Sequence, residues 1–166
     1  MKIRELMCSV VHSCGPQDSL AAAARPMWEH DCGMLPVVHA DGRVVAAITD
    51  RDICMAGWTR GRALSELRVA DAMSRDVVTC SPDEDVAAAA AKMAQRQVHR
   101  LPVVDAAGKL LGILSLNDLA IASANDPRLA KDALTALRGA CRPRATVPAR
   151  GAPPATKDAA ETAAGA

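Results

Sequence analysis

The sequence predicts an α+β protein with two copies of a strand–helix–strand–strand–helix unit, followed by a C-terminal helix and a disordered tail. Three observations support this prediction: a duplicated pattern, β-branched runs that alternate with alanine-rich stretches in each copy, and a change of composition near residue 141. Two copies are too few for a solenoid. We therefore expect them to pack as a pair related by pseudo-two-fold symmetry.

The duplication extends without a gap from residue 7 to residue 53. A shift of 66 positions places Met7 on Met73, Cys14 on Cys80 and Asp52 on Asp118, and the run Leu-Pro-Val-Val occurs at 35–38 and again at 101–104. The chain then divides into a first repeat at 2–57, a linker at 58–68, a second repeat at 69–124, a C-terminal helix at 125–140 and a tail at 141–166.

The second repeat begins with a predicted strand and helix. Residues 76–80 (DVVTC) are a short β-branched run, which is typical of a strand. Ser81, Pro82 and Glu84 have the pattern of a capping box with proline at the first helical position, so we expect a helix from there to about residue 97. The face of this helix that packs on a sheet would consist of Val86, Ala90, Met93 and Ala94.

Two further strands and two helices complete the prediction. The runs LPVVD (101–105) and LLGILS (110–115) are strands joined by a turn that contains Gly108. The next helix opens at Ser115, as its counterpart in the first repeat opens at Thr49. The C-terminal helix begins at Asp126 and Pro127, closes at Gly139, and has four apolar residues at helical spacing: Leu129, Ala133, Leu134 and Leu137.

The tail and the overall composition exclude several classes of protein. Residues 141–166 are rich in Ala, Pro and Gly without apolar periodicity, so we expect disorder there. The net charge is only +1, and Trp28 and Trp58 are the only aromatic residues of the Phe, Tyr and Trp class, which argues against nucleic-acid or membrane partners. No segment is long and apolar enough to span a membrane or to form a signal peptide.

Six cysteines occur without a Cys-x-x-Cys pair. Four of them have apolar neighbours, so we expect small buried thiols in a reducing compartment and a cytoplasmic protein. His12 with Cys14, and His30 with Cys32, also suggest a metal site. Their spacing fits no usual zinc arrangement, and Cys14 has Cys80 as its partner in the other repeat. We favour structural cysteines and no metal.

The main functional signal is the pattern Thr49…Asp52, repeated as Ser115…Asp118. One interpretation is a capping box at a strand-to-helix turn. The other is a ligand site, because a helix N-terminus suits a phosphate and a carboxylate one turn later can accept hydrogen bonds from a ribose diol. Repetition of the motif after each Leu-Pro-Val-Val run strengthens the second interpretation.

These motifs resemble a tandem pair of CBS domains (named after cystathionine β-synthase), also called a Bateman module. The similarity covers about residues 2–124, through MCSVVHSCGPQDSL…MLPVVHADGRVVAAITDRDI in the first copy and MSRDVVTCSPDEDV…HRLPVVDAAGKLLGILSLNDL in the second. It implies two small sheets packed face to face and clefts between the repeats that bind adenosine-containing ligands. It also implies a regulatory role rather than catalysis.

The resemblance assigns roles to particular residues. Asp52 and Asp118 would hold ribose, and Thr49 and Ser115 would lie near the ribose or phosphate. The adenine pocket would be lined by the segments 4–9 and 70–75, which include Arg4, Met7, Ala70 and Met73, together with Cys32 and Val98.

His99 and Arg100 match the family's phosphate-binding pair, and they occur in the second copy only, because the first has Gly33 and Met34. Across a two-fold axis this pair can reach a ligand held by Asp52. We therefore expect one phosphate site and a second site for a less charged adenosine ligand, or an empty one. The alternative is that His99 and Arg100 cap the preceding helix.

The inter-repeat region leaves two interpretations open. The basic residues Arg51, Arg60, Arg62, Arg68 and Arg75 form a solvated face or meet phosphates or a partner. Trp58 is an anchor of the linker or an interface residue, since it stands alone.

Our leading hypothesis is a non-catalytic sensor of AMP, ADP, ATP or S-adenosylmethionine, with no obligatory cofactor, that signals to an unidentified partner protein. We also expect a homodimer, since the Leu129–Leu137 stripe needs a surface to cover it. The alternatives are a dimerisation scaffold without a ligand and a nucleotide-processing enzyme. No recognisable nucleophile–base set or phosphate-binding glycine loop supports the enzyme.

Overall fold

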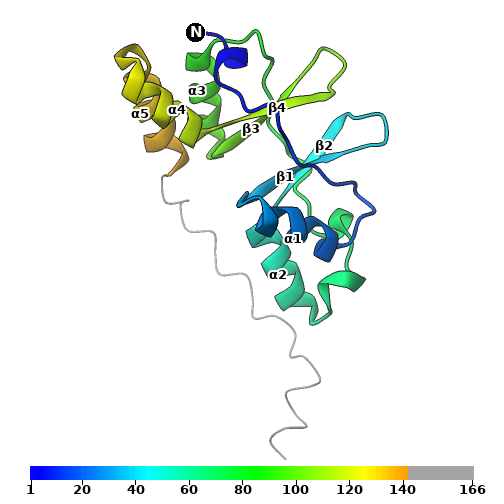
Figure 1. Ribbon diagram of the computed structural model, residues 1–166. Coiled ribbons are helices and arrows are strands. Elements are labelled where there is room, and N and C mark those ends of the chain that lie inside the picture. Colours follow the sequence, from blue (N-terminus) through cyan, green and yellow to red (C-terminus); the bar gives the residue numbers. More distant parts are fainter. Residues whose placement is uncertain (142–166) are drawn as a thin grey trace, which may run out of the picture.

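The computed structural model describes residues 1–141, which form two halves, one for each repeat (Figure 1). The first half contains α1 (Leu20–Glu29), β1 (Met34–Val38), β2 (Val44–Thr49) and α2 (Asp50–Arg60). The second contains α3 (Val86–Arg96), β3 (Arg100–Val104), β4 (Leu110–Ser115), α4 (Leu116–Asn125) and α5 (Ala130–Ala140). Short 3-10 turns lie at Ile3–Glu5, Leu64–Glu66, Val69–Asp71 and Pro127–Leu129. The predicted α+β class is confirmed.

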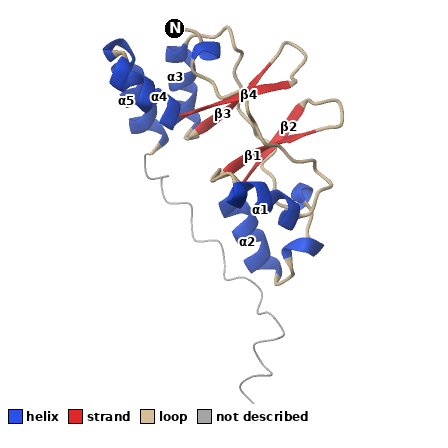
Figure 2. Ribbon diagram, in the orientation of Figure 1, coloured by secondary structure: helices blue, strands red, loops and turns tan. Residues whose placement is uncertain are grey.

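Each half is built on an antiparallel hairpin. In β1–β2, Leu35 is paired with Ile48, and in β3–β4, Leu101 is paired with Leu114. Both hairpins turn at a glycine, Gly42 or Gly108, with φ of 84° and 79°, a conformation that L side chains rarely adopt. Figure 2 shows the two hairpins side by side between the two groups of helices.

Reciprocal hydrogen bonds join the two hairpin turns. Val44 N donates to Gly108 O at 3.0 Å, and Leu110 N donates to Gly42 O at 3.1 Å. These bonds exchange into each other under the 66-residue shift, as two-fold symmetry requires. The expected pseudo-two-fold arrangement is therefore present in the backbone.

The first segment of each repeat packs on the other half. Cys8 forms a bridge with Ile113 of β4, while Ser74, its counterpart, forms a bridge with Ala47 of β2. The side chain of Ile3 is buried in the second half, and its counterpart Val69 is buried in the first. The two halves thus exchange their N-terminal segments, which sequence periodicity alone did not indicate.

The core consists of two clusters of Val, Leu, Ile, Met, Ala and Cys, one in each half. In the first, Leu35, Val37 and Ile48 of the hairpin pack on Leu20 and Met27 of α1. The second repeats this arrangement and adds Leu129, Ala133, Ala136 and Ala140 from the C-terminal segment. Helix α5 therefore belongs to the core of the second half only.

Two predictions about the start of the second repeat are wrong. The run 76–80 is not a strand: only Cys80 pairs, in a parallel bridge with Val103. The helix does not begin at Pro82 but at Val86, after the N-cap residue Asp85. The Ser81–Glu84 pattern instead closes a separate turn, in which Ser81 N donates to Glu84 Oε2 at 2.8 Å.

The C-terminal helix also differs from its prediction. Asp126 and Pro127 begin a short 3-10 turn, after which α5 starts at Ala130. The predicted apolar stripe is divided, because Leu129 and Ala133 are buried whereas Leu134 and Leu137 are exposed. Gly139 does not end the helix. It is buried within α5 against Ala94, where a Cβ atom would overlap that residue.

The burial of the cysteines was predicted too broadly. Only Cys14 and Cys80 are buried, Cys32 is half-buried, and the remaining three are exposed: Cys8, Cys54 and Cys141. All six thiols are free. The predicted disordered tail, residues 141–166, lies outside the described part of the chain except for Cys141, which follows the last residue of α5. Among residues 1–141, no helix has both the length and the apolar character that crossing a membrane requires.

Candidate functional site

Two matching capping boxes lie where each hairpin leads into a helix. Thr49 N and Oγ1 donate to Asp52 Oδ2 at 2.9 and 2.7 Å, and Asp52 N donates back to Thr49 Oγ1 at 3.2 Å. Ser115 and Asp118 repeat the arrangement at 2.7, 2.7 and 3.2 Å. The capping interpretation is therefore confirmed. Each Asp keeps a second oxygen, Oδ1, that accepts no hydrogen bond from residues 1–141, so a capping role leaves room for a ligand.

The N-terminus of α2 offers few free N–H groups to a phosphate. Asp50 N donates to Gly33 O at 3.4 Å, Arg51 N to Asp50 Oδ1 at 2.6 Å, and Asp52 N to Thr49 Oγ1. The first turn is thus satisfied within the protein. An anion at this position would depend on side-chain cations rather than on the helix terminus.

Arg100 provides such a cation from the other repeat. It begins β3 opposite Ser115, yet its guanidinium lies over the first half, where a Cβ atom on Gly33 would be 3.7 Å from Arg100 Nη1 and 3.2 Å from Asp50 Oδ2. Arg100 is exposed, and it forms no hydrogen bond or ion pair with the described residues. A guanidinium held in this way can bind a phosphate through parallel hydrogen bonds.

His99 contacts a different part of the molecule. Its Nε2 atom lies 3.9 Å from Cys141 Sγ at the end of α5. Within residues 1–141, neither His99 nor Arg100 bonds the last carbonyls of α3, where Gln97 N and Val98 N donate to Met93 O. The side chains therefore do not cap that helix. His99 and Arg100 are adjacent in sequence, yet His99 lies beside Cys141 at the end of α5 and Arg100 lies beside Gly33.

The corresponding position in the first repeat is apolar. The residue equivalent to Arg100 is Met34, which is buried in β1. The residue equivalent to Asp50 is Leu116, which is also buried. The first half therefore combines Asp52 with nearby charged groups, whereas the second combines Asp118 with apolar neighbours. The sequence analysis missed Gly33 and Asp50 as neighbours of Arg100. The available signal was the 66-residue shift, which pairs the charged Asp50 with the apolar Leu116.

The residues expected to form the adenine pocket separate into two groups. Cys32 and Met73 pack on the core of the first half, and Met7 and Val98 on that of the second. Ala70 N donates to Pro16 O, which places Ala70 in the first half.

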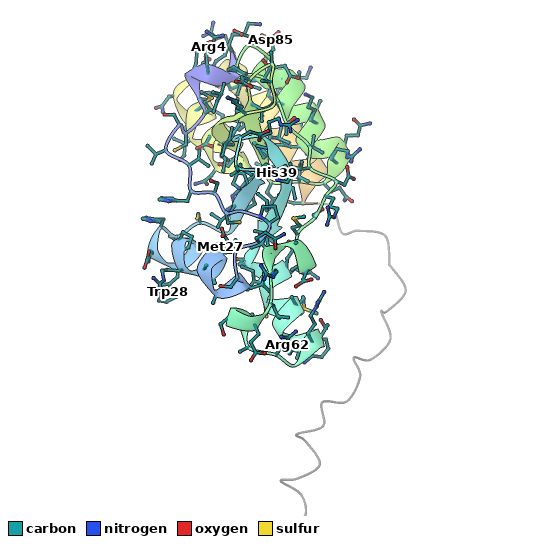
Figure 3. The ribbon with its side chains drawn as sticks, turned by 90° about the vertical axis from the view of Figure 1, so that its right-hand side faces the viewer. Arg4, Met27, Trp28, His39, Arg62 and Asp85 are labelled. Atoms are coloured by element: carbon teal, nitrogen blue, oxygen red, sulfur yellow. The ribbon has the colours of Figure 1, made fainter. Side chains whose placement is uncertain are left out.

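Arg4 is directed away from the centre of the molecule. It pairs with Asp83. Figure 3 shows Arg4, near Asp85, at the end of the molecule opposite Arg62.

The titration of Cys32 reflects its position between the repeats. Burial raises the pKa of the Cys32 thiol, while the charge of Arg100 acts to lower it and that of Asp31 to raise it. The Arg100 guanidinium, which lies over the first half beside Gly33, is thus close enough to act on this thiol.

The two His–Cys pairs differ from a usual metal centre in their geometry. No group of three or more potential ligands is present within residues 1–141. The rings of His12 and His30 are stacked in parallel, with centroids 3.7 Å apart and an interplanar angle of 5°. Lone pairs of stacked rings lie in parallel planes and do not converge on one ion.

Most of the basic set around the linker has local partners. Arg60 contacts Asp71, Arg62 pairs with Glu66 at 3.2 Å, and Arg68 donates to Gln17 Oε1 at 3.0 Å. Arg51 and Arg75 have no side-chain partner in the described chain. Three of the five arginines therefore have contacts within the linker region or with Gln17, and these contacts reduce the charge free to meet another molecule.

Comparison with known proteins identifies the repeats. The CBS domain pattern matches residues 3–58 and again 69–125. The chain is 34% identical over 119 residues to a CBS domain-containing protein, YhcV, of Bacillus subtilis, covering 72% of this chain and 83% of that protein.

Two solved structures have a similar fold. One is the CBS domain pair of protein MJ0100 in complex with 5′-methylthioadenosine and S-adenosyl-L-methionine, with a TM-score of 0.67, 25% identity, and coverage of 75% of this chain and 97% of that one. The other is CBSX2 in complex with AMP, with a TM-score of 0.67, 25% identity, and coverage of 76% and 98%.

Proposed function

Because the chain belongs to the CBS domain family and contains two CBS domains, we propose that it is a regulatory module that binds adenosine-containing nucleotides and signals their presence to another protein. One observation supports this most strongly. Two equivalent carboxylates, Asp52 and Asp118, stand at equivalent helix starts with one oxygen free, and Arg100 extends from one repeat to the other. The AMP and S-adenosylmethionine complexes of similar proteins agree with such a ligand.

The site in the first half suits a nucleotide with a phosphate. Asp52 Oδ1 would accept hydrogen bonds from the ribose hydroxyls, with Thr49 beside it. Arg100 would bind the phosphate, because its guanidinium is exposed and has no partner in residues 1–141. His99 would reach the ligand only by turning away from Cys141. Cys32 and Met73 supply an apolar surface for adenine.

The site in the second half suits a less charged adenosine ligand. Asp118 and Ser115 repeat the ribose group, but Met34 and Leu116 replace the charged residues. A desolvated phosphate without a cation would be costly there. Met7 and Val98 supply the apolar surface on this side.

A thermal-shift screen tests the proposal. The full chain is heated with AMP, ADP, ATP, S-adenosylmethionine and NADH, each in large excess. A ligand at about 100 times its dissociation constant stabilises the fold by roughly 2.7 kcal/mol, which raises the melting temperature measurably. We expect stabilisation by at least one adenosine ligand and none by the matching guanosine compound.

Two other functions make different predictions. A scaffold whose clefts have lost their ligands would show no shift with any adenosine compound. An enzyme would convert the nucleotide, so chromatography of the incubated ligand would reveal a product. We expect the nucleotide to be recovered intact.

A further inference from the structure

A thiol and an imidazole meet at the C-terminal end of α5. Cys141 follows the last residue of this helix, and its backbone N–H donates to Leu137 O at 3.0 Å. His99 lies in the segment that leads from α3 into β3, where Leu116 N donates to its carbonyl oxygen at 2.9 Å. The His99 Nε2 atom is 3.9 Å from the Cys141 Sγ atom, within hydrogen-bonding range for sulfur. Backbone hydrogen bonds on both sides therefore hold the two groups together.

The other thiols of residues 1–141 differ from Cys141 in exposure or in partner. Three of them are buried or half-buried: Cys14, Cys80 and Cys32. Cys8 and Cys54 are exposed, as Cys141 is. However, Cys8 Sγ donates to the carbonyl oxygen of Val10 at 3.4 Å, and the Cys54 thiol forms no hydrogen bond with the described residues. Among the exposed thiols of this part of the chain, only Cys141 has a base within reach.

This arrangement favours nucleophilic attack by the sulfur atom. The thiolate, rather than the thiol, is the attacking form of cysteine. A neutral imidazole at hydrogen-bonding distance accepts the thiol proton and so generates the thiolate. The ring then carries a positive charge at the C-terminal end of α5, where the helix dipole favours a cation. The exposed position of Cys141 gives a small oxidant access to the sulfur.

Hydrogen peroxide is a small oxidant that reacts with such a thiolate. The Cys141 sulfur attacks one peroxide oxygen, so an S–O bond forms as the O–O bond breaks. The leaving hydroxide takes the proton held by His99 and departs as water. Sulfur is oxidised by two electrons, peroxide is reduced, and the product is a sulfenic acid. A low-molecular-mass thiol can then condense with it to give a mixed disulfide and water, which makes the modification reversible.

His99 also belongs to the pair expected to bind the nucleotide phosphate. Arg100 lies over the first half beside Gly33, whereas the His99 ring is directed toward Cys141. The ring can contact a phosphate in the first half only by leaving the thiol. One imidazole cannot serve both groups at once, so phosphate binding through His99 competes with activation of the thiol.

We propose that Cys141 and His99 form a peroxide-reactive site at the end of α5, and that a nucleotide whose phosphate draws His99 away slows the oxidation. The reactive site goes beyond the proposed function and does not depend on it. The competition rests on the proposed function.

Site-resolved labelling tests the reactive site. The full chain is treated with hydrogen peroxide and dimedone, which traps sulfenic acids, and each cysteine is followed by peptide mass spectrometry. Since general-base assistance typically contributes about 100-fold or more, we expect Cys141 to be labelled at least ~10-fold faster than Cys54 in the same molecule. His99→Gln should remove this advantage. His39→Gln, at an exposed histidine after β1, is the matched control and should leave the advantage unchanged.

AMP tests the competition. Calorimetry on the same protein gives the AMP concentration that saturates the site, and labelling is repeated at that concentration. Labelling of Cys141 should fall toward the rate found in His99→Gln, whereas labelling of Cys54 should not change. The buried Cys14 and Cys80 report on folding, so they should remain unlabelled in every sample.

The two parts of the proposal can be overturned separately. Equal labelling of Cys141 and Cys54 in the wild type, or unchanged labelling of Cys141 in His99→Gln, would overturn the reactive site. Undiminished labelling of Cys141 with AMP bound would overturn the competition alone. If calorimetry detects no AMP binding, the phosphate site of the proposed function fails and the competition with it, while His99→Gln still decides the reactive site.

Discussion

At the scale of single residues, burial has its clearest chemical effect on Cys14 and Cys80. Burial raises the pKa of each thiol to about 12, with smaller contributions from Asp18 and Glu84. The folded protein therefore holds these protons more tightly than the unfolded chain, whose thiols titrate near 9. This stabilisation is complete below pH 9 and is lost as the pH rises toward 12. We expect the free energy of unfolding, measured with urea, to fall between pH 9 and pH 11.

Matched variants separate this effect from other titrations. Cys14→Ala with Cys80→Ala should flatten the decline, whereas Cys8→Ala with Cys54→Ala should leave its slope unchanged, because those thiols are exposed. Thiol reagents should modify Cys8, Cys54 and Cys141 in the folded protein and reach Cys14 and Cys80 only after denaturation. Rapid modification of all six in the folded state would contradict the burial.

At the scale of elements, the contact between α5 and α3 depends on one glycine. Gly139→Ala places a Cβ atom against Ala94, so overpacking should cost about 1–3 kcal/mol of unfolding free energy despite the better helix propensity of alanine. Ala94→Gly in the same chain removes one of the three overlapping atoms, the Cβ, and leaves the backbone Cα and O atoms of residue 94 in place, so it should recover part of the loss. Chemical denaturation of the two single variants and the double variant measures this coupling.

Gly57→Ala is the control for helix propensity. Gly57 lies in α2, and its Cβ atom would be 3.1 Å from Leu64 Cδ2, the end of a flexible side chain that can move. We expect a small change in stability there. If Gly139→Ala were as mild as Gly57→Ala, the close packing of α5 on α3 would be wrong.

At the scale of the whole molecule, the exchanged N-terminal segments make the two halves depend on each other. Ile3 lies at the start of the first repeat but is buried in the second half, and Val69, at the start of the second repeat, is buried in the first half. Ile3→Ala should cost about 2–5 kcal/mol, and the loss of amide hydrogen-exchange protection should be greatest in α3 and β4. Val69→Ala should act mainly on β1 and β2. Loss of protection in β1 and β2 on changing Ile3 would contradict the exchange.

Which features could be predicted from the sequence depends on whether a local pattern determines them. The duplication and the capping boxes at Thr49 and Ser115 are set by residue identity at short range, so they were found correctly. The prediction of a strand at 76–80 was wrong because pairing there is limited to one bridge, in which Cys80 bonds to the backbone of Pro102 and Val104, far away in sequence. Gly139 was misjudged because a glycine that ends a helix and one that permits close packing look alike in sequence.

In the candidate site, too, features set by local sequence could be predicted, whereas features that depend on contacts distant in sequence could not. The positions of Asp52 and Asp118 were accessible from their spacing, whereas the direction of Arg100 toward Gly33 follows from the pairing of two hairpins far apart in sequence. The separation of His99 from Arg100 could not be predicted, because it depends on where α5 ends. The 66-residue shift pairs Trp28 with Ala94. The exposure of Trp28 could not be predicted from this pairing, because it depends on the position of α5, which covers Ala94 only.

The most direct test of the two unequal sites is calorimetry with AMP and adenosine on the wild type, Arg100→Ala and Asp52→Ala. Arg100→Ala removes a charge-assisted hydrogen bond worth on the order of 1.5–3 kcal/mol, so AMP binding should weaken by roughly ten- to a hundred-fold while adenosine binding stays nearly unchanged. Asp52→Ala should weaken both ligands, and Arg25→Ala, a control at an exposed arginine of α1, neither. Wild-type AMP affinity in Arg100→Ala would show that the cation has no part in choosing the ligand.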